Sequence, residues 1–525
     1  MPQEQLAEQT LSLGKSKGRS TIAKVQNTQT EELIIGLCYP LGAHRTIVIE
    51  ALKNQLQSEY GYDSIEVIKL SKYILEHSKI KFKEENKTEA FQTYMTKIKG
   101  GDELRKHHNL DSILGDLAIK QIHNNRLNAA PKDKDGNPIL EDIESRRICF
   151  IIDSIKNKAE LSLFRSIYKD NFYLLSIYTP EPERRRLLSA MGDNEIDEIL
   201  KIDNKENFTY GQNVSGTFID ADYFLRVSNP HGEEELERNE KFQKLINDKI
   251  LRFLDLIFEA RVITPDKNES AMYLAKSAAG NSSCLSRQVG ACLTDKNGEV
   301  LSEGWNEVPK YNGNVYDNSS QKDRRCFILG NCSNDTTKDE ITDEIVKYLL
   351  NDKDLKETLS PLKIINALKK NIRNSKISDL IEYSRSVHAE MNAIIKGAQN
   401  TADRMKGGKL FCTTYPCHNC ARHIVFAGIS EVYYIEPYTK SYATHLHKDS
   451  ITDDEDVKDK VKILFYDGVA PRRYLQFFSN LNERKNNGIL AKKLRKDLKP
   501  KTMISLKALS TLEQQAIHSL NEKEL

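Results

Sequence analysis

Short apolar runs of strand length alternate with long helical patterns over the first part of this chain. Strands that alternate with helices can pair in parallel, because each helix carries the chain back to the starting edge of the sheet. The pattern predicts an α/β domain over residues 31–225, with a parallel sheet covered by helices. Its predicted strands are Leu33–Cys38, Ile65–Leu70, Ile148–Ile152 and Phe172–Tyr178.

The 525 residues of the chain exceed the size of one compact domain, at about 150 residues per domain. Residues 1–30 are rich in Gln, Ser, Thr and Lys without a sustained apolar period, so we expect a mobile arm there. The apolar series from Phe242 to Ile257 recurs at helical spacing. Residues 226–264 are therefore expected to contain a connecting helix.

A second alternating pattern follows and predicts another α/β domain at residues 265–480. A two-stranded hairpin is expected near its start, because two strand-like runs flank the turn sequence from Asp295 to Gly298. The expected elements are a helix at 271–279, strands at 289–294 and 300–303, a helix from Val387, and strands at 410–413 and 431–435 separated by a further helix.

The last segment, residues 481–525, is expected to be a basic tail. Within 484–501, eight basic residues stand against the single acid Asp497, a local charge of +7. A charge run names no partner by itself, so a solvated helix face is favoured over a contact with nucleic acid or phosphate.

The composition is that of a soluble globular protein, with 39% hydrophobic residues, 29% charged residues and a net charge of +2. It excludes a disordered chain and a generally polybasic one. No apolar stretch reaches the roughly 20 residues that span a bilayer, and the first 20 residues lack the apolar core of a secretory signal. We expect a cytoplasmic protein without a membrane partner, in which nine cysteines are too few for a disulfide framework.

The clearest chemical motif is His388-Ala-Glu390 followed by Pro416-Cys417-His-Asn-Cys420. The pattern H-x-E…P-C-x-x-C is the signature of zinc deaminases. Two thiolates three positions apart at a helix start can bind one Zn²⁺ together with the imidazole of His388. The fourth position stays open, and the carboxylate of Glu390 is close enough to move protons without being a ligand.

Two other uses of zinc remain open at this point. His418 or His423 could supply a fourth ligand, which would make the zinc structural. Cys284, Cys326 and Cys332 lie in loop-like surroundings and could hold a second zinc, although no tight C-x-x-C pairs them.

Several segments around the motif resemble deoxycytidylate-type deaminases in identity and order. They are Ser286 to Ala291, Gly304-Trp-Asn306-Glu-Val-Pro309, His388 to Ala393 and Pro416 to Cys420. The resemblance covers about residues 265–480 and implies a cytidine-deaminase-like α/β/α fold. It also implies that Asn306 bonds the sugar of the nucleotide; a turn-stabilising role is the alternative. Cations near the pocket would bind the phosphates, with Arg287, Arg385, Lys440, Arg472 and Arg473 as candidates.

The whole chain resembles the large bacterial antiviral deoxycytidine-nucleotide deaminases, which join a P-loop kinase-like domain to a deaminase domain. The segments Asp153 to Lys156, Asp170 to Tyr173 and Gly468 to Tyr474 carry this resemblance. It implies removal of dCTP and dCMP during phage infection. It also leaves room for a silencing partner, either a regulatory nucleotide or an inhibitory RNA, and the deaminase resemblance implies a homo-oligomer.

The first domain departs from the phosphate-binding pattern G-x-x-x-x-G-K-[ST]. With Thr46 as the last position, Tyr39 and His44 replace the glycines and Arg45 replaces the lysine. Gly42, Arg45, Thr46 and Asp153 are the candidate nucleotide-binding residues there, with Arg105 as a candidate phosphate contact. We expect a domain that senses a nucleotide without efficient phosphoryl transfer.

The predicted function is zinc-dependent deamination of free deoxycytidine nucleotides, dCTP, dCMP or both, to deoxyuridine nucleotides and ammonia. The alternatives are a deaminase of single-stranded DNA or RNA that uses the basic tail, a housekeeping dCMP deaminase, and a nucleotide-sensing switch with an inactive site.

Overall fold

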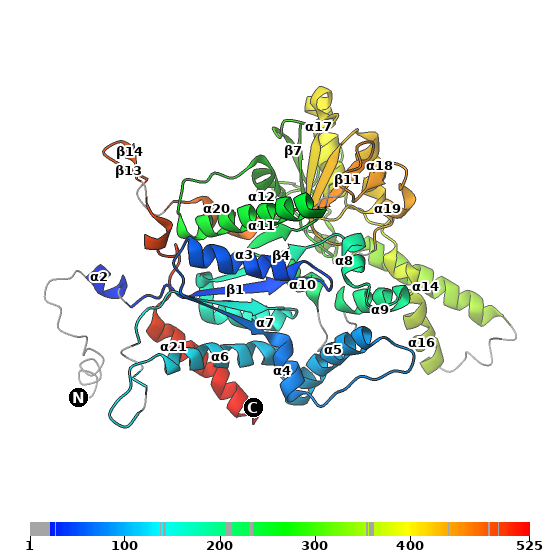
Figure 1. Ribbon diagram of the computed structural model, residues 1–525. Helices are drawn as coiled ribbons and strands as arrows, with labels where there is room; N and C mark the ends of the chain where they lie inside the picture. Colours follow the sequence, from blue (N-terminus) through cyan, green and yellow to red (C-terminus); the bar gives the residue numbers. More distant parts are fainter. Residues whose placement is uncertain are drawn as a thin grey trace, which may run out of the picture.

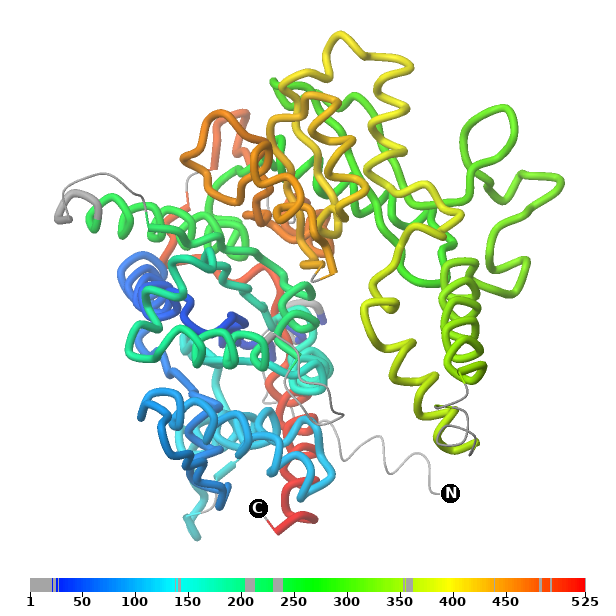
Figure 2. The backbone as a smooth tube through the Cα atoms, turned by 90° about the vertical axis from the view of Figure 1, so that its right-hand side faces the viewer, coloured from blue at the N-terminus to red at the C-terminus, as the bar shows by residue number. Residues whose placement is uncertain are grey.

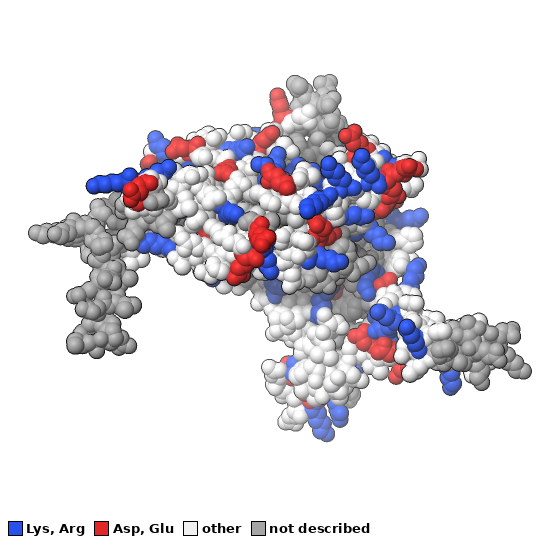
Figure 3. Space-filling model, turned by 90° about the horizontal axis from the view of Figure 1, so that it is seen from below, with Lys and Arg blue, Asp and Glu red and all other residues white. Residues whose placement is uncertain are grey.

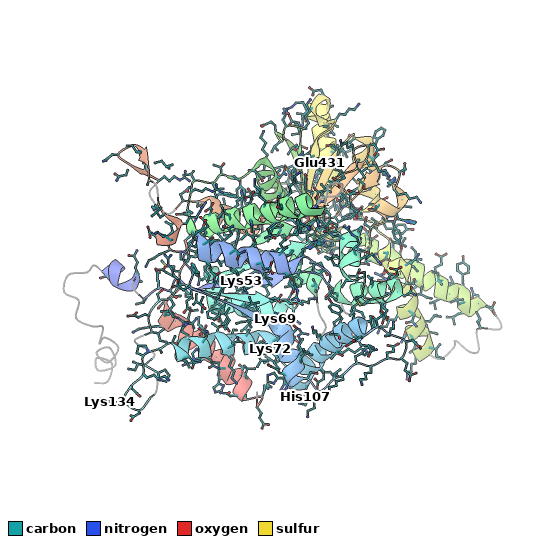
Figure 4. The ribbon with its side chains drawn as sticks, in the orientation of Figure 1. Lys53, Lys69, Lys72, His107, Lys134 and Glu431 are labelled. Atoms are coloured by element: carbon teal, nitrogen blue, oxygen red, sulfur yellow. The ribbon has the colours of Figure 1, made fainter. Side chains whose placement is uncertain are left out.

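The structure is a computed structural model with two six-stranded sheets, each covered by helices (Figure 1). Lys69 ends a strand of the first sheet and Glu431 begins a strand of the second, and Figure 4 marks both. None of the described helices combines the length and the apolar character needed to cross a bilayer. The described residues are 21–524, without 27, 137, 140–142, 205–212, 230–234, 353–354, 356–361, 439, 481–483 and 492.

The first sheet has the order β12-β5-β4-β1-β3-β2, and its five N-terminal strands are parallel. Its central strands β1, β3 and β4 are buried almost throughout, as the continuous apolar runs predict. The parallel sheet is therefore confirmed, while its kinase-like identity stays a prediction. The five strands are β1 (Leu33–Cys38), β2 (Ser64–Lys69), β3 (Ile148–Asp153), β4 (Phe172–Tyr178) and β5 (Tyr223–Arg226).

Helices cover both faces of this sheet because alternate residues of β1 point to opposite sides. Leu33, Ile35 and Leu37 belong to the core formed with helices α3 (Arg45–Ser58) and α11 (Glu235–Phe258). Ile34 and Cys38 belong to the core on the other side. The helices of that side are α6 (Ile113–Asn128) and α7 (Lys158–Tyr168), and further helices of this domain are α4 (Leu70–His77), α5 (Glu89–His108), α8 (Glu181–Leu187), α9 (Asp193–Asn204) and α10 (Val214–Phe218).

The second sheet has the order β10-β11-β9-β8-β6-β7. β6 pairs antiparallel with β7 and β8, as the predicted hairpin requires, whereas β8, β9, β11 and β10 run parallel. The strands are β6 (Gly290–Thr294), β7 (Val300–Trp305), β8 (Lys409–Thr414), β9 (Glu431–Glu436), β10 (Ile451–Thr452) and β11 (Val461–Phe465).

Two glycines allow helices to pack closely against opposite faces of the β6–β7 hairpin. A Cβ on Gly290 would lie 2.0 Å from the carbonyl oxygen of Ala275 in α12 (Lys267–Ala279). A Cβ on Gly304 would lie 2.3 Å from the carbonyl oxygen of Ala389 in α17 (Ala389–Met405). Larger residues at these positions would push both helices away from the sheet.

An insertion between β7 and α17 extends from the body of the second domain as a pair of helices, seen at the lower right of Figure 1. No helix or strand was predicted there from the sequence pattern. The insertion contains α13 (Cys326–Leu329), α14 (Ser333–Asn351), α16 (Leu362–Arg373) and the 3₁₀ helix η3 (Lys376–Asp379). Its base reaches the zinc motif described below.

The end of the chain returns to the first domain, and Figure 2 shows this last segment, in red, along the cyan part of that domain. Strand β12 (Gly468–Val469) pairs antiparallel with β5. Helix α21 (Leu506–Asn521) buries Leu509, Ala516 and Leu520 in the same core as α6. Strand β12 and helix α21 therefore build on the first domain, after the chain has completed the second sheet.

The basic segment is largely exposed, as a solvated face requires, with Arg484, Lys485, Lys493 and Lys496 among its exposed residues, but part of its charge is paired within the molecule. Arg495 binds Asp255 at 2.8 Å and Glu59 at 2.7 Å, while Lys499 lies 3.0 Å from Glu31. Acidic side chains far away in the sequence thus neutralise part of the run, which local sequence cannot reveal. Lys492 lies outside the described residues, as do residues 1–20 of the expected arm and 230–234 before the connecting helix.

We expect Glu513→Gln to destabilise the protein, because Glu513 is fully buried and accepts hydrogen bonds from Arg126 and, at 2.8 Å, from the Tyr168 hydroxyl. Weakening this buried pair should lower the free energy of unfolding by about 3 kcal/mol. Urea unfolding measures the change. Glu522→Gln at the C-cap of the same helix is the control, since Glu522 is exposed, and it should change stability by less than about 0.5 kcal/mol. Equal stability of both variants would contradict the role of Glu513.

Candidate metal centre and active site

The zinc motif lies where the N-termini of two helices meet. His388 is the N-cap residue of α17, and Cys417 is the N-cap residue of α18 (His418–Phe426). Cys420 lies in the first turn of α18, and its backbone N–H donates to the Cys417 sulfur at 3.4 Å. The positive ends of two helix dipoles therefore point towards the thiols, which favours their ionised form.

The three side chains are spaced as one metal ion requires. His388 Nδ1 lies 3.3 Å from Cys417 Sγ and 3.4 Å from Cys420 Sγ, and all three ligand atoms lie within 4.8 Å of one another. Tetrahedral Zn²⁺ with ordinary Zn–N and Zn–S bonds would hold nitrogen and sulfur about 3.5 Å apart. One imidazole and two thiols are also a donor set suited to zinc. The predicted zinc ligands thus form one site.

Interactions within the site shift the pKa values of its ligands. The hydrogen bond from Cys420, together with His388, lowers the pKa of Cys417 to about 4, although burial opposes this. Burial disfavours the charged form of His388, but the hydrogen bond and charge of Cys417 outweigh it and raise the pKa to about 9. The site therefore stabilises a thiolate at neutral pH.

Glu390 lies in the first turn of α17, two residues after His388, and is only 4% exposed. Burial and the neighbouring Cys417 raise the pKa of its carboxyl group to about 7. A carboxyl group in this range can both accept and return a proton near neutral pH.

The two histidines that could have closed the metal site have other partners. His418 Nε2 lies 3.3 Å from Glu382 Oε1, and His423 Nδ1 lies 2.7 Å from the Asn419 carbonyl oxygen. Within the described residues, the metal-ligand group contains His388, Cys417 and Cys420 alone. Three protein ligands leave a coordination position for water or substrate, as in catalytic zinc sites.

A cavity of about 320 Å³ opens beside these ligands, within the size range of small-molecule sites. His388, Glu390 and Cys417 line it together with candidates from the sequence analysis, Arg287, Asn306, Arg385 and Lys440. Lys338 from the insertion also lines the cavity and was not anticipated, because nothing in the sequence of α14 links it to the zinc motif.

The amide of Asn306 holds the segment on which Arg287 lies. Its Nδ2 donates to the Arg287 carbonyl oxygen at 2.8 Å, and its Oδ1 accepts from the Val289 N–H at 2.8 Å. Arg287 itself is 3.2 Å from Glu436 and lies over the ring of Tyr438. These contacts agree with the turn-stabilising alternative for Asn306, while sugar binding stays a prediction.

Arg472 and Arg473 do not line this cavity. Both bind the buried Asp222 of the first domain, Arg473 through Nε at 2.8 Å, and Arg473 also contacts Asp170. Their sequence position near the end of the second domain suggested a phosphate contact, but the return of the chain to the first sheet places them between the domains.

The remaining candidate cysteines lie at the same cavity without forming a second tight metal group. Cys284, Cys326 and Cys332 all line it, but among the described residues only His388, Cys417 and Cys420 bring their ligand atoms close enough to share an ion. Cys292 and Cys412 are buried in neighbouring strands, as expected for small core residues.

The altered phosphate-binding loop is closed by its own side chains. Asp153 is buried and accepts from the Tyr39 hydroxyl and, at 2.7 Å, from Arg45 Nη1. Gly42, Arg45 and Thr46 line a separate cavity of about 550 Å³, but Asp153 does not. Arg105 also lines this cavity, where it binds Glu160 at 2.9 Å. The structure thus places the candidate residues close together, but the Asp153 carboxylate is already hydrogen-bonded to Tyr39 and Arg45.

We expect the purified protein to contain one zinc ion per chain. Cys420→Ser should reduce zinc to well below half an ion per chain, because it removes one of three ligands. A Cys326→Ser/Cys332→Ser double variant serves as the control and should retain the metal. Atomic absorption of dialysed protein measures the content. Two zinc ions in the wild type, with one lost in the double variant, would contradict a single site.

Residues 265–436 match the family described as the cytidine and deoxycytidylate deaminase zinc-binding region. The deoxycytidylate deaminase of Enterobacteria phage T4 is 26% identical over 181 residues, which are 33% of this chain and 80% of the phage protein. ComE operon protein 2 of Bacillus subtilis (strain 168) is 35% identical over 96 residues, which are 16% of this chain and 50% of that protein.

Among solved structures, the dCMP deaminase of cyanophage S-TIM5 in complex with dCMP and dUMP is similar, with 21% identity and a TM-score of 0.23. The match covers 39% of this chain and 99% of the cyanophage chain. The sequence match and the spacing of His388, Cys417 and Cys420 agree. The second part of the chain therefore contains a cytidine and deoxycytidylate deaminase-like zinc-binding domain.

Proposed function

We propose that the protein deaminates free deoxycytidine nucleotides, dCTP, dCMP or both, to deoxyuridine nucleotides and ammonia. The observation that carries this proposal is the open three-ligand site beside the buried carboxyl group of Glu390, at the wall of a nucleotide-sized cavity. The similarity to deoxycytidylate deaminases supports the choice of base and sugar.

Zinc held by His388, Cys417 and Cys420 would supply Lewis-acid activation of water at neutral pH. Glu390 takes a proton from the attacking water and delivers it to the ring nitrogen of cytosine. The water oxygen forms a bond to C4, the bond between C4 and the exocyclic nitrogen breaks, and ammonia leaves with a proton passed through Glu390. Burial of Glu390 keeps bulk water away from this transfer.

A free nucleotide is favoured over a polynucleotide because part of the charge of the basic segment is already neutralised within the molecule. Arg495, Lys499 and Lys501 are paired with acidic residues of the first domain and α11 region. Figure 3 shows basic and acidic side chains interspersed over the face that it presents. A continuous basic groove is the usual basis for binding a single strand.

We expect the zinc-loaded wild type to release ammonia from dCTP or dCMP and not from single-stranded DNA. Glu390→Gln should lower turnover by about 10²-fold or more while zinc content is unchanged, because the proton carrier is lost and the ligands remain. Coupled ammonia detection and chromatography of the uracil product measure the reaction. Turnover of Glu390→Gln at the wild-type rate would remove Glu390 from the mechanism.

For the first domain we propose ligand sensing without phosphoryl transfer, at the cavity lined by Gly42, Arg45 and Thr46. A metal-assisting aspartate must be available to Mg²⁺, but Asp153 is held by Tyr39 and Arg45. A tyrosine in place of the first glycine also prevents the backbone from wrapping a phosphate in the usual way.

We therefore expect no phosphate release above background when the protein is incubated with ATP or GTP and Mg²⁺, measured by a colorimetric phosphate assay. Asp153→Asn provides the control for a contaminating enzyme, since contamination would be unaffected by it. Magnesium-dependent release that disappears in Asp153→Asn would show that the loop is active after all.

The resemblance to bacterial antiviral deaminases supports a role in depleting dCTP during phage infection, which we propose as the biological use of the reaction. A homo-oligomer and an inhibitory RNA or nucleotide belong to the same proposal.

In bacteria that express the wild type, we expect the dCTP pool to fall after infection and the number of phage to fall with it. Glu390→Gln should abolish both effects, and mass spectrometry of nucleotide pools measures the first. Steady dCMP deamination without infection, and no protection from phage, would indicate the housekeeping alternative.

A further inference from the structure

Lys338 is a buried cation at the wall of the active-site cavity. It lies in the second turn of α14, within the insertion, and is only 6% exposed. The same cavity is lined by Glu390 and Cys417. A lysine is rarely buried to this extent unless it is paired with an anion.

Lys338 and Lys440 converge on one neutral atom. The Lys338 ammonium donates to the Ser378 carbonyl oxygen at 3.0 Å, and the Lys440 ammonium donates to the same oxygen at 2.9 Å. Two positive charges that share one acceptor repel each other, so a single carbonyl does not neutralise the pair.

The acidic groups of this region have other partners. Asp379 lies 3.1 Å from Lys440, whereas Asp335 and Asp339 bind Arg373 at 3.0 Å and 2.6 Å. Among the described residues, no ion pair to a carboxylate is found for Lys338. Burial and the charges of Arg373 and Lys440 lower its pKa, against the opposing effects of Asp335 and Cys332. The positive charge of Lys338 is therefore not balanced by a paired carboxylate among the described residues.

The N-terminal turn of α14 faces the same cavity. Ser333, Asn334 and Asp335 line it, and they begin a helix of 19 residues. The N-terminus of a helix carries a partial positive charge and backbone N–H groups that bind anions. This turn adds to the positive potential that Lys338 creates.

We propose that Lys338, assisted by Lys440, binds the phosphate group of the nucleotide whose base reaches Glu390 and the metal ligands. An ammonium group has three N–H donors, and the Ser378 carbonyl oxygen uses one of them on Lys338. A phosphate oxygen at the other donors completes a charge-assisted interaction. The insertion then selects nucleotides over nucleosides; this inference rests on the proposed function.

The test measures binding separately from turnover. Zinc-loaded protein with Glu390→Gln is titrated with dCMP and with deoxycytidine by calorimetry, because this background binds without consuming the ligand. Adding Lys338→Met should raise the dissociation constant for dCMP about tenfold or more. The constant for deoxycytidine should stay within about twofold. Lys440→Met should likewise raise the dissociation constant for dCMP and leave that for deoxycytidine nearly unchanged.

Lys347→Met is the matched control, since Lys347 is an exposed lysine of the same helix that does not line the cavity. It should leave both constants unchanged. A misfolded variant would lose deoxycytidine binding as well and would be recognised by its zinc content. The proposal is overturned if Lys338→Met weakens both ligands equally, or if dCMP binds no more tightly than deoxycytidine before the change. Absence of ammonia release by the wild type would instead refute the proposed function and leave the binding result standing.

Discussion

The close approach of α17 to the β6–β7 hairpin decides the geometry of the whole metal centre. Gly304 leaves no side chain between the sheet and the Ala389 carbonyl, so the first turn of α17 rests directly on β7. His388 and Glu390 are carried by that turn and meet the thiols of Cys417 and Cys420 at the start of α18. Because both helices present their positive ends, the backbone as well as the side chains stabilises the thiolate ligands.

The two domains are joined by buried ion pairs in addition to the chain itself. Glu269 in the first turn of α12 accepts both guanidinium nitrogens of Arg252 from α11, at 2.8 and 2.7 Å, and the Val469 N–H of β12 at 3.0 Å. Arg473 binds Asp222 at the edge of the first sheet. These contacts connect the first helix of the deaminase-like domain to the domain with the closed loop.

The local sequence pattern was sufficient to predict most helices and strands and the three metal ligands. Apolar runs such as Ile148–Ile152 became buried strands, and the turn from Asp295 to Gly298 joins an antiparallel hairpin, because these signals depend on neighbours in sequence. Local pattern did not predict the partners of Arg472, Arg473 and Arg495, which bind the acids Asp222 and Asp255. Such pairing across more than two hundred residues has no periodic signature.

The sequence alone determined the zinc ligands, since H-x-E and P-C-x-x-C place them at helix starts through short-range geometry. It also determined that the first domain is built on a parallel sheet. The tertiary structure decided which charges surround the substrate cavity, bringing Lys338 of the insertion and Lys440 beside Glu390. It also decided that Arg45 binds Asp153 and that β12 pairs with β5 of the first domain. These outcomes depend on long-range packing, in which burial and charge pairing between distant segments override what each segment suggests by itself.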